Sequence, residues 1–397
     1  MQLSLVELSF MKSKITLRDF TSAQKRREFL EKNLNIKLDN VSKFTFTQDQ
    51  VVGRNIENLI GAAQIPLGIA GPLKVHSSKL IVNSYYIPLA TTEGALVASI
   101  SRGCKAITQS GGAYAAVEDV GQTRGPVFKI KNLEHGIKTK LWIENNFKLL
   151  YSTSEKTSSH LKLLKTLVTL VGKNLFVRFS YDTGNAMGMN MVTIATQAVA
   201  GLIEAKTQAQ CIALAGNFDI DKKPAWLNFT LGRGKKVWAE VTLPKKIIKD
   251  ILKTTPDNLA QLNYRKNHLG SIMSGSLGFN AHYANIIAAL FIATGQDPAH
   301  AVEGSLGVTT AEVLENNDLY FSIYLPSLIV GTIGGGTHLP TQQEALKLMQ
   351  VASALEYAQV VGAAVLAGEL SLIASLTEGT LAKAHQKLGR KGRQIFK

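Results

Sequence analysis

The chain is short of residues that form disulfides, bind metals or stack on nucleic acids. It has two cysteines in 397 residues, Cys104 and Cys211, which make neither a disulfide framework nor zinc-finger spacing and favour a reducing compartment. Its eight histidines include no H-E-x-x-H or other clustered pattern, so we expect no metal. Aromatic residues make up 7% of the chain and are not interleaved with basic ones, which argues against nucleic-acid binding.

Long apolar runs are also missing. A bilayer span needs about 20 apolar residues, whereas Ala284–Thr294 is shorter and Val360–Leu376 contains Glu369. The first twenty residues lack the cationic region, apolar core and cleavage site of a signal peptide. The sequence therefore predicts a soluble, cytoplasmic protein without an integral membrane segment.

The overall composition indicates a globular enzyme. The length allows two or three domains with cores of their own, and 45% apolar with 18% charged residues is ordinary for such a chain. The formal net charge of +15 suits a polyanionic small molecule such as CoA or NADPH, or a membrane surface, better than it suits nucleic acid in a chain with so few aromatics.

Changes of pattern divide the chain into three parts. Residues 1–50 are polar and contain one helical stretch, Thr21–Asn35, so we expect a small helical N-terminal region. Residues 126–214 are rich in lysine and β-branched residues, and we expect them to form a small α+β domain inserted into a larger one. The larger domain would then comprise residues 51–125 and 215–397.

Local signals place several elements. In the insert, a helix over Ser158–Leu170 is expected between the strand-like runs Pro126–Ile130 and Leu175–Phe179. In the larger domain, Ile65–Val75 is strand-like, and a helix is expected from a Thr91-Thr92 cap onward. Further helices are predicted over Asn280–Thr294, with Gly295 as its stop, and over Thr377–Leu388.

Four charged residues suggest carbonyl chemistry. Lys222 and Lys223 precede Pro224, and carboxylates lie on separate segments at Glu93 and Asp297. A fixed cation stabilises an acyl oxygen that gains negative charge, and a carboxyl group with a raised pKa can donate a proton. Each residue also has a simpler role: a solvated lysine pair, and helix capping by Glu93 and by Asp297, which precedes Pro298.

The remaining candidates are weaker by themselves. His385 lies on the last predicted helix beside a glycine-rich basic tail, where it could protonate a leaving group or simply pack. Gly184–Met191 is glycine-spaced but lacks the G-x-G-x-x-G fingerprint of a dinucleotide site. Gly334-Gly335-Gly336 allows a backbone to approach a phosphate closely, or forms only a turn.

Nine segments taken together resemble 3-hydroxy-3-methylglutaryl-CoA (HMG-CoA) reductases, in the order expected of that family, and the D-K-K-P word resembles its class I branch. The segments are Glu57–Gly61, Thr91–Gly94, Arg102–Ala106, Thr123–Pro126, Ala186–Met191, Asp221–Ala225, Gly295–Asp297, Gly331–Thr337 and Ala367–Ser371.

The resemblance implies two hydride transfers from NADPH, or from NADH, to HMG-CoA, which yield mevalonate and free CoA. It implies that Lys222 polarises the acyl oxygen, Glu93 donates a proton, Asp297 tunes both and His385 protonates the CoA thiolate. The other implied sites are listed by ligand: Arg124, Asp221, Lys223, Lys266 and Asn285 for the hydroxymethylglutaryl group; Arg102 and Lys105 for CoA; and Ser158, Asn185, Met189, Asn190, Gly335, Gly336 and Thr337 for the dinucleotide.

The same resemblance implies an α+β fold, with a large substrate domain around a central helix and an inserted ferredoxin-like cofactor domain. It also implies a homodimer with shared active sites and Glu57–Gly61 at the interface. Some positions depart from the family pattern: Asn185 replaces an aspartate, Ala215 a substrate-binding serine, Ser159 an arginine for the 2′-phosphate, Leu388 a second histidine and Lys391 a phosphorylated serine.

These departures keep two alternatives open. One is a reductase of another acyl-CoA, which Ala215 favours. The other is a non-catalytic acyl-CoA-binding protein, which would bind the thioester without turnover. Glu93, Lys222, Asp297 and His385 are all present, which favours the catalytic interpretation.

Overall fold

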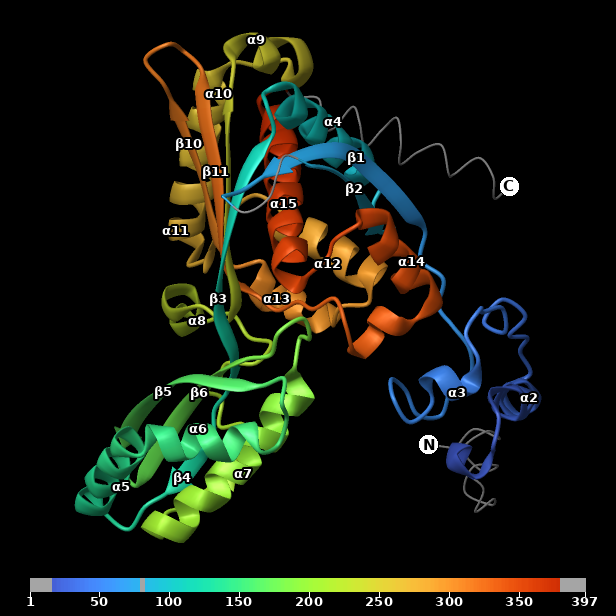
Figure 1. Ribbon diagram of the computed structural model, residues 1–397. Helices are drawn as coiled ribbons and strands as arrows, with labels where there is room; N and C mark the ends of the chain where they lie inside the picture. Colours follow the sequence, from blue (N-terminus) through green and yellow to red (C-terminus); the bar gives the residue numbers. More distant parts are fainter. Residues whose placement is uncertain (1–15, 79–82, 379–397) are drawn as a thin grey trace, which may run out of the picture.

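The computed structural model describes residues 16–78 and 83–378 (Figure 1). The chain begins with a small helical region: a 3-10 turn Leu17–Asp19, α2 (Ala23–Leu34) and α3 (Gln48–Val51). The side chain of Ser22 accepts a hydrogen bond from the Lys25 amide, and Asn35 ends α2 in the left-handed conformation. The predicted helix Thr21–Asn35 is therefore confirmed.

A mixed sheet forms the frame of the larger part of the molecule. Its strands are β1 (Leu67–His76), β2 (Asn83–Ala90), β3 (Ala113–Arg124), β8 (Gly234–Leu243), β9 (Gly278–Phe279), β10 (Gly307–Val313) and β11 (Leu319–Leu328). They pair in the order β3-β8-β11-β10-β9, while β1 pairs with β2 and runs parallel to the start of β3. The strand-like run Ile65–Val75 is confirmed by β1.

The helix α15 (Ala354–Thr377) runs through the middle of this part (Figure 1). It packs with α4 (Leu96–Gln109) and α12 (Tyr283–Thr294) against the sheet, in one large apolar core. Its 24 residues are long and apolar enough to cross a bilayer, so the length argument made from the sequence was wrong for this segment. Within the molecule, however, 78% of its apolar window is buried, as in a core helix.

Short elements complete this part. They are α8 (Trp226–Leu231), α9 (Lys245–Ile247), a π-helical turn Ile248–Leu252, α10 (Pro256–Leu262), a second π-helical segment Asn263–Gly270, α11 (Ser271–Ser274), the 3-10 turn η4 (Pro298–His300), α13 (Ala301–Gly304), a 3-10 turn Gly335–His338 and α14 (Pro340–Met349). The predicted helix Asn280–Thr294 is confirmed by α12, which ends at Gly295 with φ 72°.

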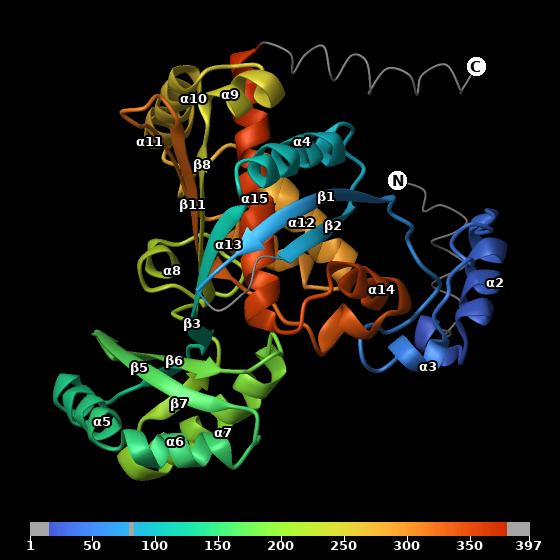
Figure 2. The ribbon, with the colours of Figure 1, turned by 45° about the horizontal axis from the view of Figure 1, so that its top comes forward.

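The residues between β3 and α8 build a separate layered unit with an apolar core of its own (Figure 2). Its elements are β4 (Val127–Lys129), α5 (Leu133–Asn145), α6 (Phe147–Glu155), β5 (Lys162–Val171), β6 (Asn174–Asp182), α7 (Met189–Thr207) and β7 (Gln210–Ala213). The strands are antiparallel in the order β7-β4-β6-β5, and the last residues of β3 pair with β6. Strand β3 thus belongs to both parts.

The helix predicted over Ser158–Leu170 was wrong, because β5 occupies most of that range and pairs with β6 along its whole length. The run K-L-L-K-T-L-V-T-L-V fits a helical spacing of leucines, but its β-branched residues and a neighbouring strand favour the extended form. Most of the predicted helix Thr377–Leu388, including His385, lies outside the described residues.

Candidate active site

Lys222 and Asp297 meet at the centre of the candidate site. Lys222 Nζ lies 2.8 Å from Asp297 Oδ2, although the two residues come from different segments. Lys222 adopts the left-handed backbone conformation, with φ 56°, and its amide donates a hydrogen bond to Glu303 Oε1 at 3.1 Å. Strained backbone of this kind is common where a side chain must be aimed at a ligand.

The position of Asp297 follows from local chain signals. Gly295 ends α12, and Asp297 then caps η4 because its Oδ1 accepts a hydrogen bond from the Ala299 amide at 3.0 Å. Partial burial acts to raise the pKa of Asp297. Hydrogen bonds from Lys222 and Ala299 and the nearby charge of Lys222 outweigh burial, so the pKa of Asp297 is lowered. Its predicted capping role is confirmed.

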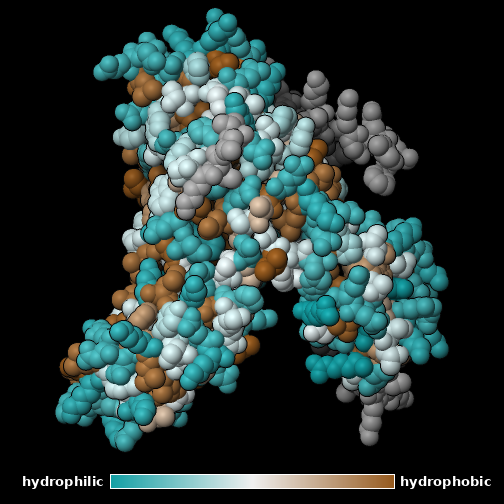
Figure 3. Space-filling view, in the orientation of Figure 1, coloured by the Kyte–Doolittle hydropathy of each residue, from teal (hydrophilic) through white to brown (hydrophobic). Residues whose placement is uncertain are grey.

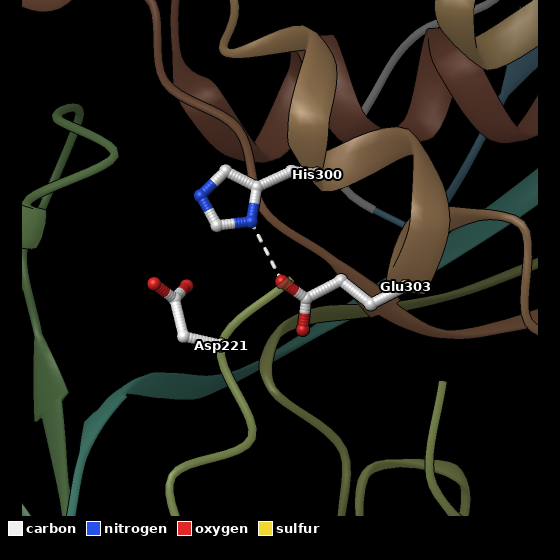
Figure 4. Close-up of side chains that lie close together, drawn as sticks. All are labelled: Asp221, His300 and Glu303. Carbon is white, nitrogen blue, oxygen red and sulfur yellow. Dashed lines mark hydrogen bonds and ion pairs between the residues drawn. The ribbon is translucent and has the colours of Figure 1, made fainter. Parts of the chain in front are cut away.

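A buried polar network lies behind this pair. Arg233 is fully buried and forms ion pairs with Glu303 Oε1 at 2.6 Å and with Asp221 Oδ1 at 3.0 Å. His300 Nδ1 lies 2.6 Å from the same Glu303 oxygen (Figure 4). Sequence reasoning missed Arg233, His300 and Glu303; the spacing of His300 and Glu303 on one helical turn was the available signal.

The ligand atoms of Asp221, His300 and Glu303 lie within 4.8 Å of one another, as metal ligands can. The guanidinium group of Arg233 already contacts both carboxylates and supplies the positive charge that a metal ion would bring. For this reason we assign no metal to the cluster.

Arg124, expected to bind a substrate carboxylate, faces a protein carboxylate instead. Its Nη1 lies 3.5 Å from Asp219 Oδ2, and Asp219 is buried with neither oxygen hydrogen-bonded in this structure. Burial raises the pKa of Asp219, and the charges of Arg233 and Arg124 lower it only in part. The guanidinium group of Arg124 can bind a carboxylate, but in this structure it already lies near the carboxylate of Asp219.

Five of the seven predicted dinucleotide residues line one cavity of about 740 Å³. Its lining includes Met189, Asn190, Gly335, Gly336, Thr337 and, at one edge, Asp297. Arg54 and Asn55 of the N-terminal region also line it, and Figure 3 shows the molecule hollowed between that region and the β4–β7 unit.

The cavity lining fits a phosphate-bearing ligand. Gly334 and Gly335 have positive φ, and open space lies where their side chains would be, so a ligand can approach this backbone closely. The 19-residue helix α7 begins at Met189, and its N-terminal amides favour an anion.

The other two expected dinucleotide residues are not among those that line the cavity. Asn185 Oδ1 accepts a hydrogen bond from the Ala354 amide at 3.0 Å, so it caps the start of α15. Ser158 Oγ lies 3.7 Å from Met191 Sδ.

The two expected CoA residues lie on α4. Arg102 donates hydrogen bonds to the side chain and carbonyl of Ser371 at 3.0 and 2.6 Å, which ties α4 to α15. Burial lowers the pKa of Arg102, and Glu378 opposes that effect. Lys105 is exposed on the same helix and free to reach a ligand in solution.

Glu93 lies between β2 and α4, outside the contact of Lys222 with Asp297. The expected helix start at Thr91 was wrong: α4 begins at Leu96, because Ala95 adopts the left-handed conformation with φ 74°. Glu93 therefore precedes the helix and is exposed, so neither capping of α4 nor burial beside Asp297 applies to it. Among residues 16–78 and 83–378, no hydrogen bond or ion pair joins Glu93 to Lys222 or Asp297.

The other expected substrate residues are spread around the site. Lys223 is exposed and its Nζ donates a hydrogen bond to the Asp221 carbonyl at 3.1 Å. Lys266 is exposed on the π-helical segment Asn263–Gly270, and Asn285 is half-buried in the first turn of α12. Departures from α-helical geometry of this kind are frequent at functional sites.

Comparison with solved structures identifies the fold. A class II 3-hydroxy-3-methylglutaryl-CoA reductase from Streptococcus pneumoniae, bound to NADPH in open conformations, superposes with a TM-score of 0.68. The match covers 91% of this chain and 100% of that one at 21% sequence identity. A second structure of the S. pneumoniae reductase gives the same TM-score at 19% identity, covering 91% of this chain and 99% of that one. The chain thus has the mixed α/β fold of these acyl-CoA reductases.

Sequence comparison is more specific. The 3-hydroxy-3-methylglutaryl-coenzyme A reductase of Methanocaldococcus jannaschii is 50% identical over 92% of both chains, and that of Pyrococcus horikoshii is 48% identical over 92% of this chain and 91% of that one. The hydroxymethylglutaryl-coenzyme A reductase family profile matches residues 22–390. The chain belongs to this family, whose enzymes reduce HMG-CoA to mevalonate, and it is an oxidoreductase of isoprenoid biosynthesis.

Proposed function

We propose that this chain converts HMG-CoA to mevalonate and free CoA in two successive reductions at the Lys222–Asp297 pair. The overall step consumes two reduced nicotinamides and two protons, breaks the thioester C–S bond and forms a primary alcohol. The observation that carries the proposal is the 2.8 Å contact between Lys222 Nζ and Asp297 Oδ2 beside the glycine-lined cavity.

Lys222 would stabilise the acyl oxygen each time that oxygen gains negative charge. Its side chain is partly exposed, so a substrate can reach the ammonium group, while Asp297 and the Glu303 contact hold it in place. A preorganised cation of this kind lowers a barrier by several kcal/mol in a site from which water is excluded.

Proton delivery is assigned to Glu93 and His385. Glu93 would protonate the oxygen of the aldehyde intermediate, and His385, which lies outside the described residues, would protonate the departing CoA thiolate. The exposed position of Glu93 supports a homodimer in which the Glu93 of one subunit completes the site of the other. Glu57–Gly61 would lie at that interface.

The substrate would be held by its two charged ends. Arg124 suits the hydroxymethylglutaryl carboxylate because a guanidinium group binds carboxylates at two points, with Asp221, Lys223, Lys266 and Asn285 as further contacts. Lys105 and Arg102 would meet the CoA phosphates from α4.

NADPH is the proposed reductant, with NADH as the alternative. It would supply the hydride and would be held by the cavity residues Met189, Asn190 and Gly335–Thr337, together with Ser158 and Asn185. We infer that the β4–β7 unit is a ferredoxin-like cofactor domain of residues 126–214, which its strand order β7-β4-β6-β5 with intervening helices supports. The large domain would be 51–125 and 215–397, with a helical region before it.

The reaction is tested by the loss of reduced-nicotinamide absorbance with HMG-CoA, using NADPH and NADH in parallel. Lys222→Ala should abolish turnover, whereas Lys173→Ala, on the β5–β6 turn, should leave it unchanged. A panel of other acyl-CoA esters tests the alternative substrate, and Ala215→Ser should improve HMG-CoA binding if that position contacts it. Binding of CoA esters without turnover would refute the proposal.

Shared active sites have their own test. Co-expressed Glu93→Gln and Lys222→Ala chains, each inactive alone, should together recover about a quarter of the parent activity if sites are shared, because statistical pairing makes about half of the dimers mixed and each mixed dimer has one intact site. No recovery, in a sample shown to contain mixed dimers, would mean that each site is built from one chain.

A further inference from the structure

Lys222, Asp297 and two residues behind them form a closed ring of contacts. Lys222 Nζ contacts Asp297 Oδ2, and the Lys222 amide donates to Glu303 Oε1. Glu303 Oε1 in turn lies 2.6 Å from His300 Nδ1, and His300 Nε2 lies 3.8 Å from Asp297 Oδ2. His300 and Glu303 are fully buried. The Lys222 amide is therefore linked to Glu303 and the Lys222 ammonium group to Asp297, and His300 lies near both of these carboxylates.

Both ring nitrogens of His300 face carboxylate oxygens. On the Nδ1 side, Glu303 is paired with Arg233 and accepts hydrogen bonds from the Lys222 amide and from Asn228 Nδ2, so its oxygens face Nδ1 as acceptors. On the Nε2 side the facing group is the ionised Asp297, and Nε2 has no hydrogen-bond partner in this structure. Only the imidazolium form presents a donor to each of them.

Of the other charges around His300, some favour a positive charge on the imidazole and others oppose it. Asp221, whose carboxylate lies within 4.8 Å of the imidazole, favours a positive charge, whereas Arg233 and Lys222 oppose it. The elements packed against η4 and α13 are α12 and β11, and their titratable side chains are Tyr283, Tyr320 and Tyr324. Burial raises the pKa of each of these tyrosines, so they stay neutral at physiological pH.

We propose that His300 is held as an imidazolium between Glu303 and Asp297 and is a positioning residue for Lys222. Asp297 alone would largely neutralise the Lys222 ammonium group. When Asp297 is shared between two cations, the Lys222–Asp297–His300 set carries a net positive charge toward the acyl oxygen. The positioning role of His300 rests on the proposed function of Lys222, whereas the charge of His300 is independent of it.

The kinetic test compares the pH dependence of kcat in the parent and in His300→Gln. Glutamine can still donate a hydrogen bond but carries no charge. We expect kcat to fall about ten-fold or more, as for other residues that orient a catalytic group, while KM for HMG-CoA stays within about two-fold. The parent should lose activity on the alkaline side as the imidazolium loses its proton, and this step should be absent from the variant.

Two comparisons make this result specific. Glu303→Gln should move the same alkaline step to lower pH, because it takes away the carboxylate that faces Nδ1 and leaves the imidazole titratable. His76→Gln, a histidine on β1 remote from the ring, should leave kcat and its pH profile unchanged. An unaltered kcat and pH profile in His300→Gln would overturn the inference.

A second readout needs no activity. In protein labelled with 15N-histidine, the His300 signals, assigned through His300→Gln or through His300→Asn if the first variant does not fold, should show both nitrogens protonated at neutral pH. A neutral tautomer there would overturn the inference even in an active enzyme. If the parent does not reduce HMG-CoA, the proposed function fails, and the NMR result still decides the charge of His300.

Discussion

Removing the carboxylate of Glu369 should destabilise the large part of the molecule. Glu369 is fully buried on α15, and it accepts hydrogen bonds from the amides of Ala281 and His282, at 2.9 and 2.6 Å, and from Thr309 Oγ1 at 2.9 Å. These amides precede α12, so one side chain of the central helix caps another helix of the core. The same α12 leads directly to Gly295 and Asp297.

The magnitude follows from the groups left without a partner. In Glu369→Ala the two amides lose their acceptor in a buried position, at about 1–3 kcal/mol each, while Thr309 keeps the Tyr283 hydroxyl as a partner. With a smaller term for lost packing, we expect unfolding free energy to fall by about 3–5 kcal/mol. Thr309→Val, which removes the contacts of this hydroxyl with Glu369 and Tyr283 but leaves the carboxylate, should cost about 1–2 kcal/mol.

The assay is urea unfolding followed by tryptophan fluorescence in a Trp142→Phe background. Trp142 packs against the core of the β4–β7 unit, so its removal leaves Trp226 and Trp238 as reporters of the large part. Both substitutions are compared with this background. If Glu369→Ala lost less than Thr309→Val, the capping role assigned to Glu369 would be refuted.

Three further predictions concern packing, pH and ligand binding. In Gly103→Ala the new Cβ would lie 1.9 Å from the Ala367 carbonyl oxygen, so we expect the free energy of unfolding, measured in urea, to fall by about 3 kcal/mol. The control Gly201→Ala, with open space around the new Cβ, should be neutral or slightly stabilising. Equal effects of the two substitutions would contradict this packing argument. Because the folded-state pKa of Asp297 is lowered, its contribution to stability is present above the unfolded value and lost as pH falls through the folded one. The difference in stability between the parent and Asp297→Asn, measured by thermal unfolding at each pH, should therefore disappear below about pH 4. A difference that grows in acid would contradict the sign of this pKa shift. Gly335→Val should weaken NADPH binding about ten-fold, measured by thermal shift, because a side chain there enters the cavity. Gly172→Val, at a similar positive φ on the β5–β6 turn, controls for backbone strain. The two variants should differ only in NADPH binding.

Local signals predicted the elements whose ends are decided by neighbouring residues. Gly295 and Asp297 were assigned correctly as a helix stop and a cap because each acts within its own turn. The start of α4 was not, since the threonines that could cap it lie upstream of a left-handed Ala95. Strand β5 was mistaken for a helix because its pairing with β6 lies outside the local pattern.

The order of short motifs along the chain was enough to determine the family and the reaction class, since these motifs depend only on residue types and their sequence order. The environment of those residues was decided only by the tertiary structure. Arg233 comes from a different segment than His300 and Glu303, and the three surround Lys222 and Asp297 only because the residue before β8 contacts α13. Charge and geometry at this site arise from contacts between distant parts of the chain, and such contacts leave no pattern in the local sequence.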